Sequence, residues 1–324
     1  MSPTPAPRRV VYAALAGNLA VALVKFAAAA VTRSSAMLSE AVHSLVDTIN
    51  ELLLLYGMKR AARHPDTIHP FGYGRELYFW SFIVALLVFA LGAGVAFYEG
   101  ITHWRHPEPM QRALVNYLVL GASFACEGAS WWVANREFRA AKGKQSYFAA
   151  FRSSKDPSTF TVLFEDTAAV VGLLIATAGI AAAQALNAPR LDGLASIGIS
   201  LVLVVSSLLL ARETKGLLIG EAANPHVRDS ILRIAGGDPD VRCANGVVTV
   251  QMGPRQVIAA LSAEFYDRLN TTQIEECVNR VEAAIKRAHP EVTALFVKPQ
   301  TPETWRRRIE RLAAHQDEGA DGDR

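Results

Sequence analysis

A histidine and an aspartate lie four residues apart in an apolar stretch near the N-terminus. His43 and Asp47 are separated by Ser44-Leu45-Val46, and the flanking residues are mostly apolar. On an α-helix this spacing places both side chains on one face. An imidazole and a carboxylate together suit a divalent cation of the Zn²⁺, Mn²⁺, Fe²⁺ or Co²⁺ class. The pair therefore indicates a metal site within a hydrophobic helix.

Two further acids, Glu165 and Asp166, are adjacent in a later apolar stretch. Ionisable side chains at membrane depth are costly to bury, and they mark functional sites by default. A structural role for His43 and Asp47 is the other interpretation, yet interhelical polar contacts in membranes contribute only about 1–2 kcal/mol or less. For Glu165 and Asp166 the alternatives are one ligand beside one structural acid, or one carboxyl group that carries a proton.

The composition is that of a membrane protein. The chain has 324 residues, of which 51% are hydrophobic, and its mean hydropathy is +0.19. A formal net charge of +3 gives no indication of nucleic-acid binding. Cys126, Cys243 and Cys277 are far apart and form no CxxC pair, so we expect neither a disulfide framework nor a thiolate metal cluster.

Six apolar segments are long enough to cross a lipid bilayer, which takes about 20 residues. The first is too long for the core of a signal peptide, so we expect it to remain attached as a spanning helix. Short polar turns at 32–35 and 187–190 join the first two and the last two segments as hairpins. The expected segments are 10–31, 36–57, 78–100, 114–135, 159–185 and 191–211.

Lysine and arginine placement predicts the orientation, because cytoplasmic loops carry an excess of both. One set of loops holds Arg33, Arg105, Arg112 and Arg190. The opposite set holds Arg8, Arg9, Lys59, Arg60, Arg63, Arg75, Arg136, Arg139, Lys142, Lys144, Arg152, Lys155, Arg212 and Lys215. Both termini of this multi-pass protein are therefore expected in the cytoplasm. The alanine-rich composition suggests a bacterial cytoplasmic membrane.

The chain beyond residue 212 is less hydrophobic and predicts a small cytoplasmic α+β domain. Helical segments at 225–236 and 270–288 alternate with strands at 247–252, 257–266 and 292–297, which gives the order α-β-β-α-β of a ferredoxin-like helix-on-sheet layer. The expected organisation is a tail at 1–9, a six-helix membrane domain at 10–212, this domain at 213–300 and a second tail at 301–324. The acidic, Gly-containing end of that tail is typical of disorder.

Three motifs together resemble the cation diffusion facilitator family, over roughly residues 8–299. The segment 34–47, which reads SSAMLSEAVHSLVD, is similar to the family's HxxxD helix. The segment 69–76, HPFGYGRE, is similar to its HPxGxG(K/R)xE loop. The segment 191–196, LDGLAS, is similar to its D-P-x-A-S element. The resemblance implies a homodimeric exporter of divalent metal cations that exchanges them for protons across a lipid bilayer, with no prosthetic group.

The resemblance also implies a tetrahedral metal site between the second and fifth helices. His43 and Asp47 match the second-helix pair, and Asp166 matches the second member of the fifth-helix pair because Gly172 falls at the following glycine. The first member falls on Val162, which cannot bind metal. Glu165 is about 100° around the helix from Asp166, so it reaches the site only if the helix is rotated or distorted. The candidate ligands are therefore His43, Asp47, Asp166 and Glu165.

Two further positions depart from the family pattern. In the loop, Asp66 and His69 match two ligands of a second metal site, whereas Tyr73 stands where a histidine is expected. In the C-terminal domain, His226 and His289 lie at helix ends and are not clustered on strands. We therefore expect that domain to fold and help to dimerise without bound metal.

The leading hypothesis is a secondary transporter that is not an enzyme. Because one ligand position is lost at Val162, the alternative is a regulatory or scaffold membrane protein of the same fold that transports nothing. An enzyme using the same acids is a third option, but the sequence has no nucleophile motif, phosphate loop or cofactor fingerprint.

Overall fold

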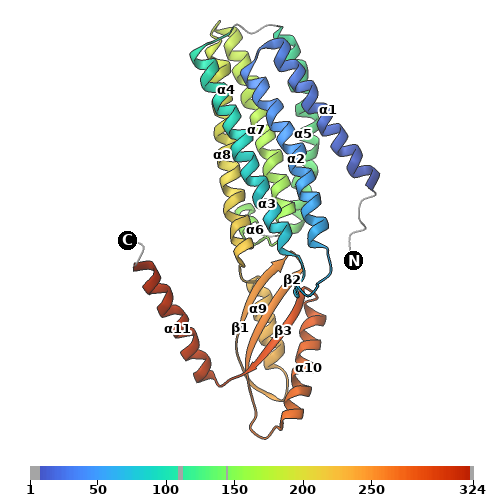
Figure 1. Ribbon diagram of the computed structural model, residues 1–324, viewed down its shortest axis with the longest axis vertical. Helices are drawn as coiled ribbons and strands as arrows, with labels where there is room; N and C mark the ends of the chain where they lie inside the picture. The colour runs from blue at the N-terminus through green and yellow to red at the C-terminus, as the bar shows by residue number, and fades with distance from the viewer. Residues whose placement is uncertain (1–7, 109–111, 144, 322–324) are drawn as a thin grey trace. The chain divides into compact units, whose positions relative to one another are not determined.

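The computed structural model describes residues 8–108, 112–143 and 145–321. The chain divides into two compact units, one ending at Gly216 and the other beginning at Leu217. The first unit is a helical bundle and the second contains a small sheet (Figure 1). This boundary lies four residues beyond the change in hydropathy that the sequence shows at residue 212.

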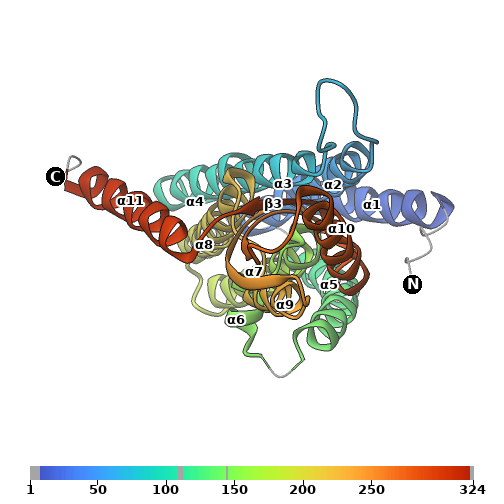
Figure 2. The same cartoon turned by 90° about the horizontal axis from the view of Figure 1, so that it is seen from below.

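The helices of the first unit run alongside one another (Figure 1), with α2 in contact with α1, α3, α4 and α7. Helices α3, η1 and α4 follow without a break, and the segment joining α2 to α3 extends sideways as a loop (Figure 2). The bounds are α1 Arg8–Thr32, α2 Ser35–Ala61, α3 Arg75–Leu87, η1 Val88–Ala93, α4 Gly94–Arg105, α5 Ala113–Lys142, α6 Tyr147–Ser153, α7 Pro157–Ala185 and α8 Arg190–Ile219.

Among the described residues, three helices are long and apolar enough by themselves to cross a membrane. They are Arg75–Arg105, Phe160–Ala185 and Arg190–Ile219, and Gly17–Thr32 is a shorter apolar helix. Leu201, Val205 and Leu208 of α8 are more than half exposed and share one face, as expected for side chains that contact lipid. The apolar helices therefore support an integral membrane protein. The count of six spans stays a prediction, because α2 and α5 carry more polar side chains.

The two short turns lie where the sequence predicts them, and one is fastened by a buried acid. Asp192 of α8 accepts hydrogen bonds from the Ser34 hydroxyl at 2.8 Å and from the Ser35 backbone N–H at 2.6 Å. It therefore satisfies donors at the N-terminus of α2 that have no partner within the helix. A carboxylate at this end also interacts favourably with the helix dipole. Ser196, one turn further along α8, hydrogen-bonds to Ser35 and Ser39.

Glycines allow α8 to approach α4 closely. A Cβ atom placed on Gly100 would lie 2.8 Å from the Gly193 carbonyl oxygen and 2.9 Å from the Ile197 backbone nitrogen. Small residues at such crossings are typical of membrane helix packing, which depends on close van der Waals contact. Within the same long helix, η1 is a π-helical turn, and the Ser200 hydroxyl of α8 donates to the Ala93 carbonyl at 2.9 Å.

The second unit confirms the predicted order α-β-β-α-β. It contains α9 (Pro225–Gly236), β1 (Val241–Gly253), β2 (Gln256–Phe265), α10 (Thr271–Ala288) and β3 (Val292–Pro299). The sheet order is β1-β2-β3, with β2 antiparallel to β1 and parallel to β3. Every second residue of β2 from position 257 to 265 is buried, and α9 and α10 pack against the same core. This alternation gives the sheet one apolar face, which the two helices cover.

A helix that the sequence analysis does not predict, α11, spans Pro302–Asp321. Residues 322–324 lie outside the described residues, and disorder at the end of the tail stays a prediction. The Trp305 ring lies where a Cβ atom on Gly246 would be, so α11 begins in contact with β1. Charge composition alone therefore misses this helix, whose first turn is held by an aromatic contact.

The Gly100 contact generates a prediction about the stability of the bundle. Replacing Gly100 with Ala should lower the unfolding temperature in detergent, because overpacking costs about 1–3 kcal/mol whereas Gly-to-Ala within a helix contributes at most about 1 kcal/mol. Gly121→Ala is the matched control, because nothing lies within 4 Å of a Cβ atom at that position. An equal effect of both substitutions on the unfolding temperature would contradict close α4–α8 packing.

Candidate metal-transport site

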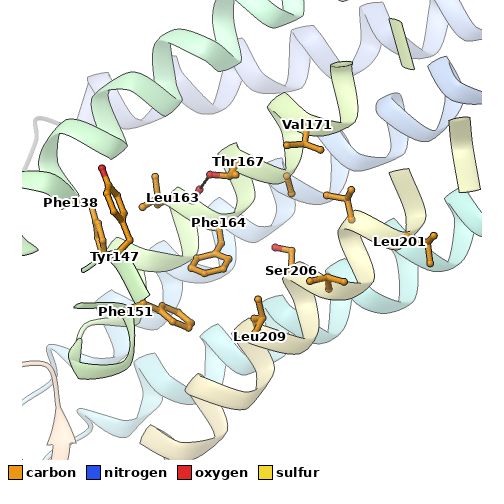
Figure 3. A pocket seen from close by; sticks show the side chains of 13 residues that line it. Phe138, Tyr147, Phe151, Leu163, Phe164, Thr167, Val171, Leu201, Ser206 and Leu209 are labelled. Carbon is orange, nitrogen blue, oxygen red and sulfur yellow. Dashed lines mark hydrogen bonds between the residues drawn. The ribbon is translucent and has the colours of Figure 1, made fainter. Parts of the chain in front are cut away.

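The helical unit contains an apolar cavity and a smaller, acidic one. The apolar cavity has a volume of about 640 Å³ and lies between α5, α6, α7 and α8. Figure 3 shows the rings of Phe138, Phe151 and Phe164 around it, with the Thr167 hydroxyl directed to its own helix. None of its lining residues is ionisable except Tyr147, so this cavity suits hydrocarbon and cannot bind a bare cation.

The smaller cavity, about 120 Å³ in volume, is acidic. It lies between α1, α2, α5 and α7, and five of its lining residues carry carboxyl groups. They are Asp47, Glu51, Glu127, Glu165 and Asp166. Neutral groups complete the wall: Asn18, Val21, Ser44, Cys126, Ser130 and Val162. Such a concentration of acid side chains inside an apolar bundle is costly unless it serves a positive ligand.

The α2 side of this acidic cavity carries the predicted histidine–aspartate pair. His43 is buried, and its Nδ1 lies 3.4 Å from Asp47 Oδ1. Neither ring nitrogen of His43 has a hydrogen-bond partner among the described residues, and neither does Asp47 Oδ1. Unsatisfied buried polar atoms are rare because each costs about 1–3 kcal/mol. These atoms are therefore available to a ligand, although His43 is not among the residues that line the cavity.

The α7 side carries both adjacent acids, which reach the cavity in different directions. Glu165 Oε1 accepts a hydrogen bond of 2.7 Å from Asn50 of α2. Asp166 Oδ2 accepts one of 2.9 Å from Ser130 of α5. Helix α7 packs against both α2 and α5, so acids about 100° apart can line the same cavity. Both acids therefore line the cavity, and Glu165 as a metal ligand stays a prediction.

Val162 lies in the same wall as Asp166, as their four-residue spacing predicts. An apolar side chain thus occupies a position from which a ligand would reach the cavity. Among the described residues, no group of three or more His, Cys, Asp or Glu side chains is close enough to hold one metal ion. The structure brings Asp47, Glu165 and Asp166 to one cavity with His43 next to it, but it does not draw the four into a coordination shell.

Other polar groups around the cavity find partners on neighbouring helices. Asn50 is fully buried and donates to Glu165. Asn18 of α1 donates to Glu51 of α2 at 2.8 Å. Lys25 of α1 pairs with Glu40 of α2 and with Glu127 of α5. Spacing along one helix cannot reveal such partners, because they lie on other helices.

In the loop between α2 and α3, the candidate metal ligand Asp66 is hydrogen-bonded to other residues of the same loop. Asp66 accepts hydrogen bonds from the Tyr73 hydroxyl at 2.6 Å and from the His69 backbone N–H at 2.7 Å. These two bonds hold the pKa of Asp66 below its ordinary value. Arg63 lies over the Tyr73 ring, 4.7 Å from its centroid. Tyr73 therefore completes a closed hydrogen-bonded loop where the family pattern has a metal ligand.

The two histidines of the second unit lie at helix ends, as the sequence predicts, and they come from different helices. The rings of His226 and His289 lie 5.9 Å apart, and His289 Nδ1 is 3.2 Å from Glu291. Burial raises the pKa of the Cys277 thiol in the same unit to about 12, so Cys277 offers no thiolate. In the described part of the chain, these two histidines and Glu291 do not form a group that could hold a metal ion.

Comparison with known proteins places this site in a family. Residues 11–219 match the family described as the cation efflux transmembrane domain. This chain belongs to the cation diffusion facilitator family, a family of membrane transporters. The match covers α2, α5 and α7, and so includes the whole acidic cavity.

Individual relatives support the same assignment. A protein named proton-coupled zinc antiporter SLC30A9, mitochondrial, from Mus musculus is 36% identical over 268 residues, which are 82% of this chain and 47% of the relative. Metal tolerance protein C4 from Arabidopsis thaliana is 32% identical over 76% of this chain and 54% of the relative. Cation-efflux pump FieF from Klebsiella pneumoniae is 26% identical over 87% of this chain and 89% of the relative. The chain spans about half the length of the SLC30A9 relatives.

The Val162 position generates a prediction about metal affinity. Val162→His should tighten Zn²⁺ binding, because an imidazole there would join Asp47 and Asp166 at the cavity. Tighter binding slows release, so the transport rate should fall as affinity rises. Isothermal titration of the detergent-purified protein measures the affinity, with Ile309→His on the exposed surface of α11 as the control. Unchanged affinity and metal selectivity in Val162→His would show that this wall does not face the bound ion.

Glu165→Gln distinguishes the two roles open to Glu165. If Glu165 replaces the ligand that is missing at Val162, the Glu165→Gln substitution should weaken Zn²⁺ binding by about tenfold or more, which is about 1.4 kcal/mol. If Glu165 only carries a proton, binding should persist while the pH dependence of transport changes. The amide keeps a hydrogen-bond acceptor for Asn50, so the substitution tests charge and not packing.

The second unit should bind no stoichiometric metal. A purified fragment of residues 217–324 forms its own core, and titration with Zn²⁺ at micromolar concentration should give no saturable heat. Binding that disappears in His289→Ala would instead identify the His226–His289 pair as a metal site.

Proposed function

We propose that the protein exports divalent metal cations from the cytoplasm in exchange for protons. The acidic cavity between α1, α2, α5 and α7 carries this proposal, because a cation is the ligand that offsets five nearby carboxyl groups. Family membership and the printed names of the relatives, which include a proton-coupled zinc antiporter and a cation-efflux pump, support it. Zinc, manganese, iron and cobalt are the candidate substrates.

The chemistry of the side chains explains how protons and metal can share one site. Carboxylates and imidazole bind a metal ion only in their deprotonated forms, so metal binding releases protons and protonation releases metal. In the proposed cycle, Asp47, Asp166 and Glu165 bind the cation with His43 from the cytoplasmic side. Protons from the opposite side then displace it. The groups hydrogen-bonded to these acids, Asn50 and Ser130, keep the carboxylates directed to the cavity.

We further propose a six-span membrane topology with both termini in the cytoplasm and a homodimeric assembly. The long helices α1, α2, α3–η1–α4, α5, α7 and α8 would be the spans. The distribution of lysine and arginine supports the orientation. The alanine-rich composition is the basis for expecting a bacterial cytoplasmic membrane. The SLC30A9 relatives are named as mitochondrial, so their names do not support this location.

Transport should depend on the α2 pair. His43→Ala and Asp47→Ala should each abolish Zn²⁺ flux into proteoliposomes driven by an opposing proton gradient, because each removes a proposed metal ligand. The proteins should still elute as folded species in detergent. Glu303→Gln on the exposed surface of α11 is the control and should transport normally.

Two outcomes would contradict the proposal. Undiminished flux in both His43→Ala and Asp47→Ala would remove these residues from the site. A folded wild-type protein with neither flux nor metal binding would favour the alternative, a regulatory or scaffold membrane protein that has lost transport with its ligand at position 162.

A further inference from the structure

Lys25 of α1 is a fully buried lysine with partners on two other helices. Its ammonium donates to Ser44 Oγ of α2 at 2.7 Å and to Glu40 Oε2 of α2 at 3.3 Å. It also donates to Glu127 Oε1 of α5 at 2.7 Å. All three ammonium hydrogens therefore have an acceptor. One cation joins three helices of the bundle.

The bundle is shaped to hold this group. Glu40 is fully buried, and a Cβ atom placed on Gly172 of α7 would lie 2.5 Å from Glu40 Oε1. Glycine at position 172 thus leaves the space that the carboxylate occupies. Stability alone is a weak reason for such a network, because replacing a buried ion pair with apolar side chains is often neutral or stabilising.

Glu127 and Ser44 connect this network to the acidic cavity. Both contact the Lys25 ammonium, and both also line the cavity, whereas Lys25 itself does not. Lys25 therefore lies behind the cavity wall and neutralises one of the acids in it. The affinity of a cation site rises with the number of charged ligands, and excessive affinity slows release.

We propose that Lys25 is a positioning residue that holds Glu127 against the cavity wall and keeps it from the transported cation. The cation is then bound by acids of α2 and α7, without Glu127. This inference rests on the proposed transport function and adds a residue to it that acts through Glu127.

The test separates affinity from rate in reconstituted protein. Initial rates of Zn²⁺ transport are measured against Zn²⁺ concentration at a fixed proton gradient, for the wild type and for two variants. The double variant Lys25→Met/Glu40→Gln removes the lysine ammonium and the charge of Glu40, its most buried partner. Glu127 is thereby released, and no unpaired charge remains on residue 40. Lys25→Met/Glu40→Gln/Glu127→Gln then removes the released acid. Lys59→Met, at the exposed end of α2, controls for loss of a lysine.

The double variant should show a KM lower by about tenfold, because a freed carboxylate within a few ångströms strengthens cation binding, together with a lower maximal rate. The triple variant should return KM to within about threefold of the wild type. If the double variant does not fold, Lys25→Gln/Glu40→Gln keeps hydrogen-bonding groups at both positions and carries the same expectation. Loss of a purely structural network would lower the amount of active protein and leave KM unchanged.

A folded double variant with the KM of the wild type would overturn the inference and leave the transport function intact. A triple variant that keeps the low KM would also overturn it, because the added affinity would not come from Glu127. Absence of Zn²⁺ flux in the wild type would overturn the proposed function itself, so the two failures are distinguishable.

Discussion

The Lys25 ammonium is buried from solvent, and it forms ion pairs there with the carboxylates of Glu40 and Glu127. Removing one partner from such a buried ion pair typically costs about 3–5 kcal/mol, far more than a surface pair contributes. The three side chains come from α1, α2 and α5, so pairing them fixes how these helices pack. The same requirement places α7, because Glu165 and Asp166 find their donors on α2 and α5. The acidic cavity is the space that remains between the four helices.

The N-terminal end of α2 is held by a different kind of contact. Asp192 of α8 caps α2, and the Gly100–Gly193 crossing brings α4 and α8 together at backbone distance. These contacts use short side chains and main-chain groups, whose geometry tolerates little change. Helix α2 is therefore anchored at its start through α8 and in its middle through Lys25. The His43–Asp47 pair lies between helices that cannot move apart without breaking one of these contacts.

The apolar and the acidic cavity show that chemistry, and not size, identifies the candidate site. The cavity of about 640 Å³ presents aromatic and aliphatic side chains, whereas the cavity of about 120 Å³ presents five acids. A membrane-embedded protein loses little by leaving apolar surface open, because hydrocarbon can cover it. It loses much by leaving carboxylates unpaired, so the smaller cavity is the one that requires a functional explanation.

Periodicity along single elements was enough to determine much of this protein from sequence. It gave the long apolar helices, the His43–Asp47 face, the shared face of Val162 and Asp166, and the α-β-β-α-β order of the second unit. These features depend on local spacing, which the sequence contains directly. Only the tertiary structure decided that Glu165 faces α2 while Asp166 faces α5, that Tyr73 closes onto Asp66, and that Lys25 joins Glu40 to Glu127. Each of these depends on which helix or loop lies opposite a side chain. Lys25 and Glu127 are 102 positions apart in the sequence, and no local pattern predicts their contact, because it forms only when the helices pack.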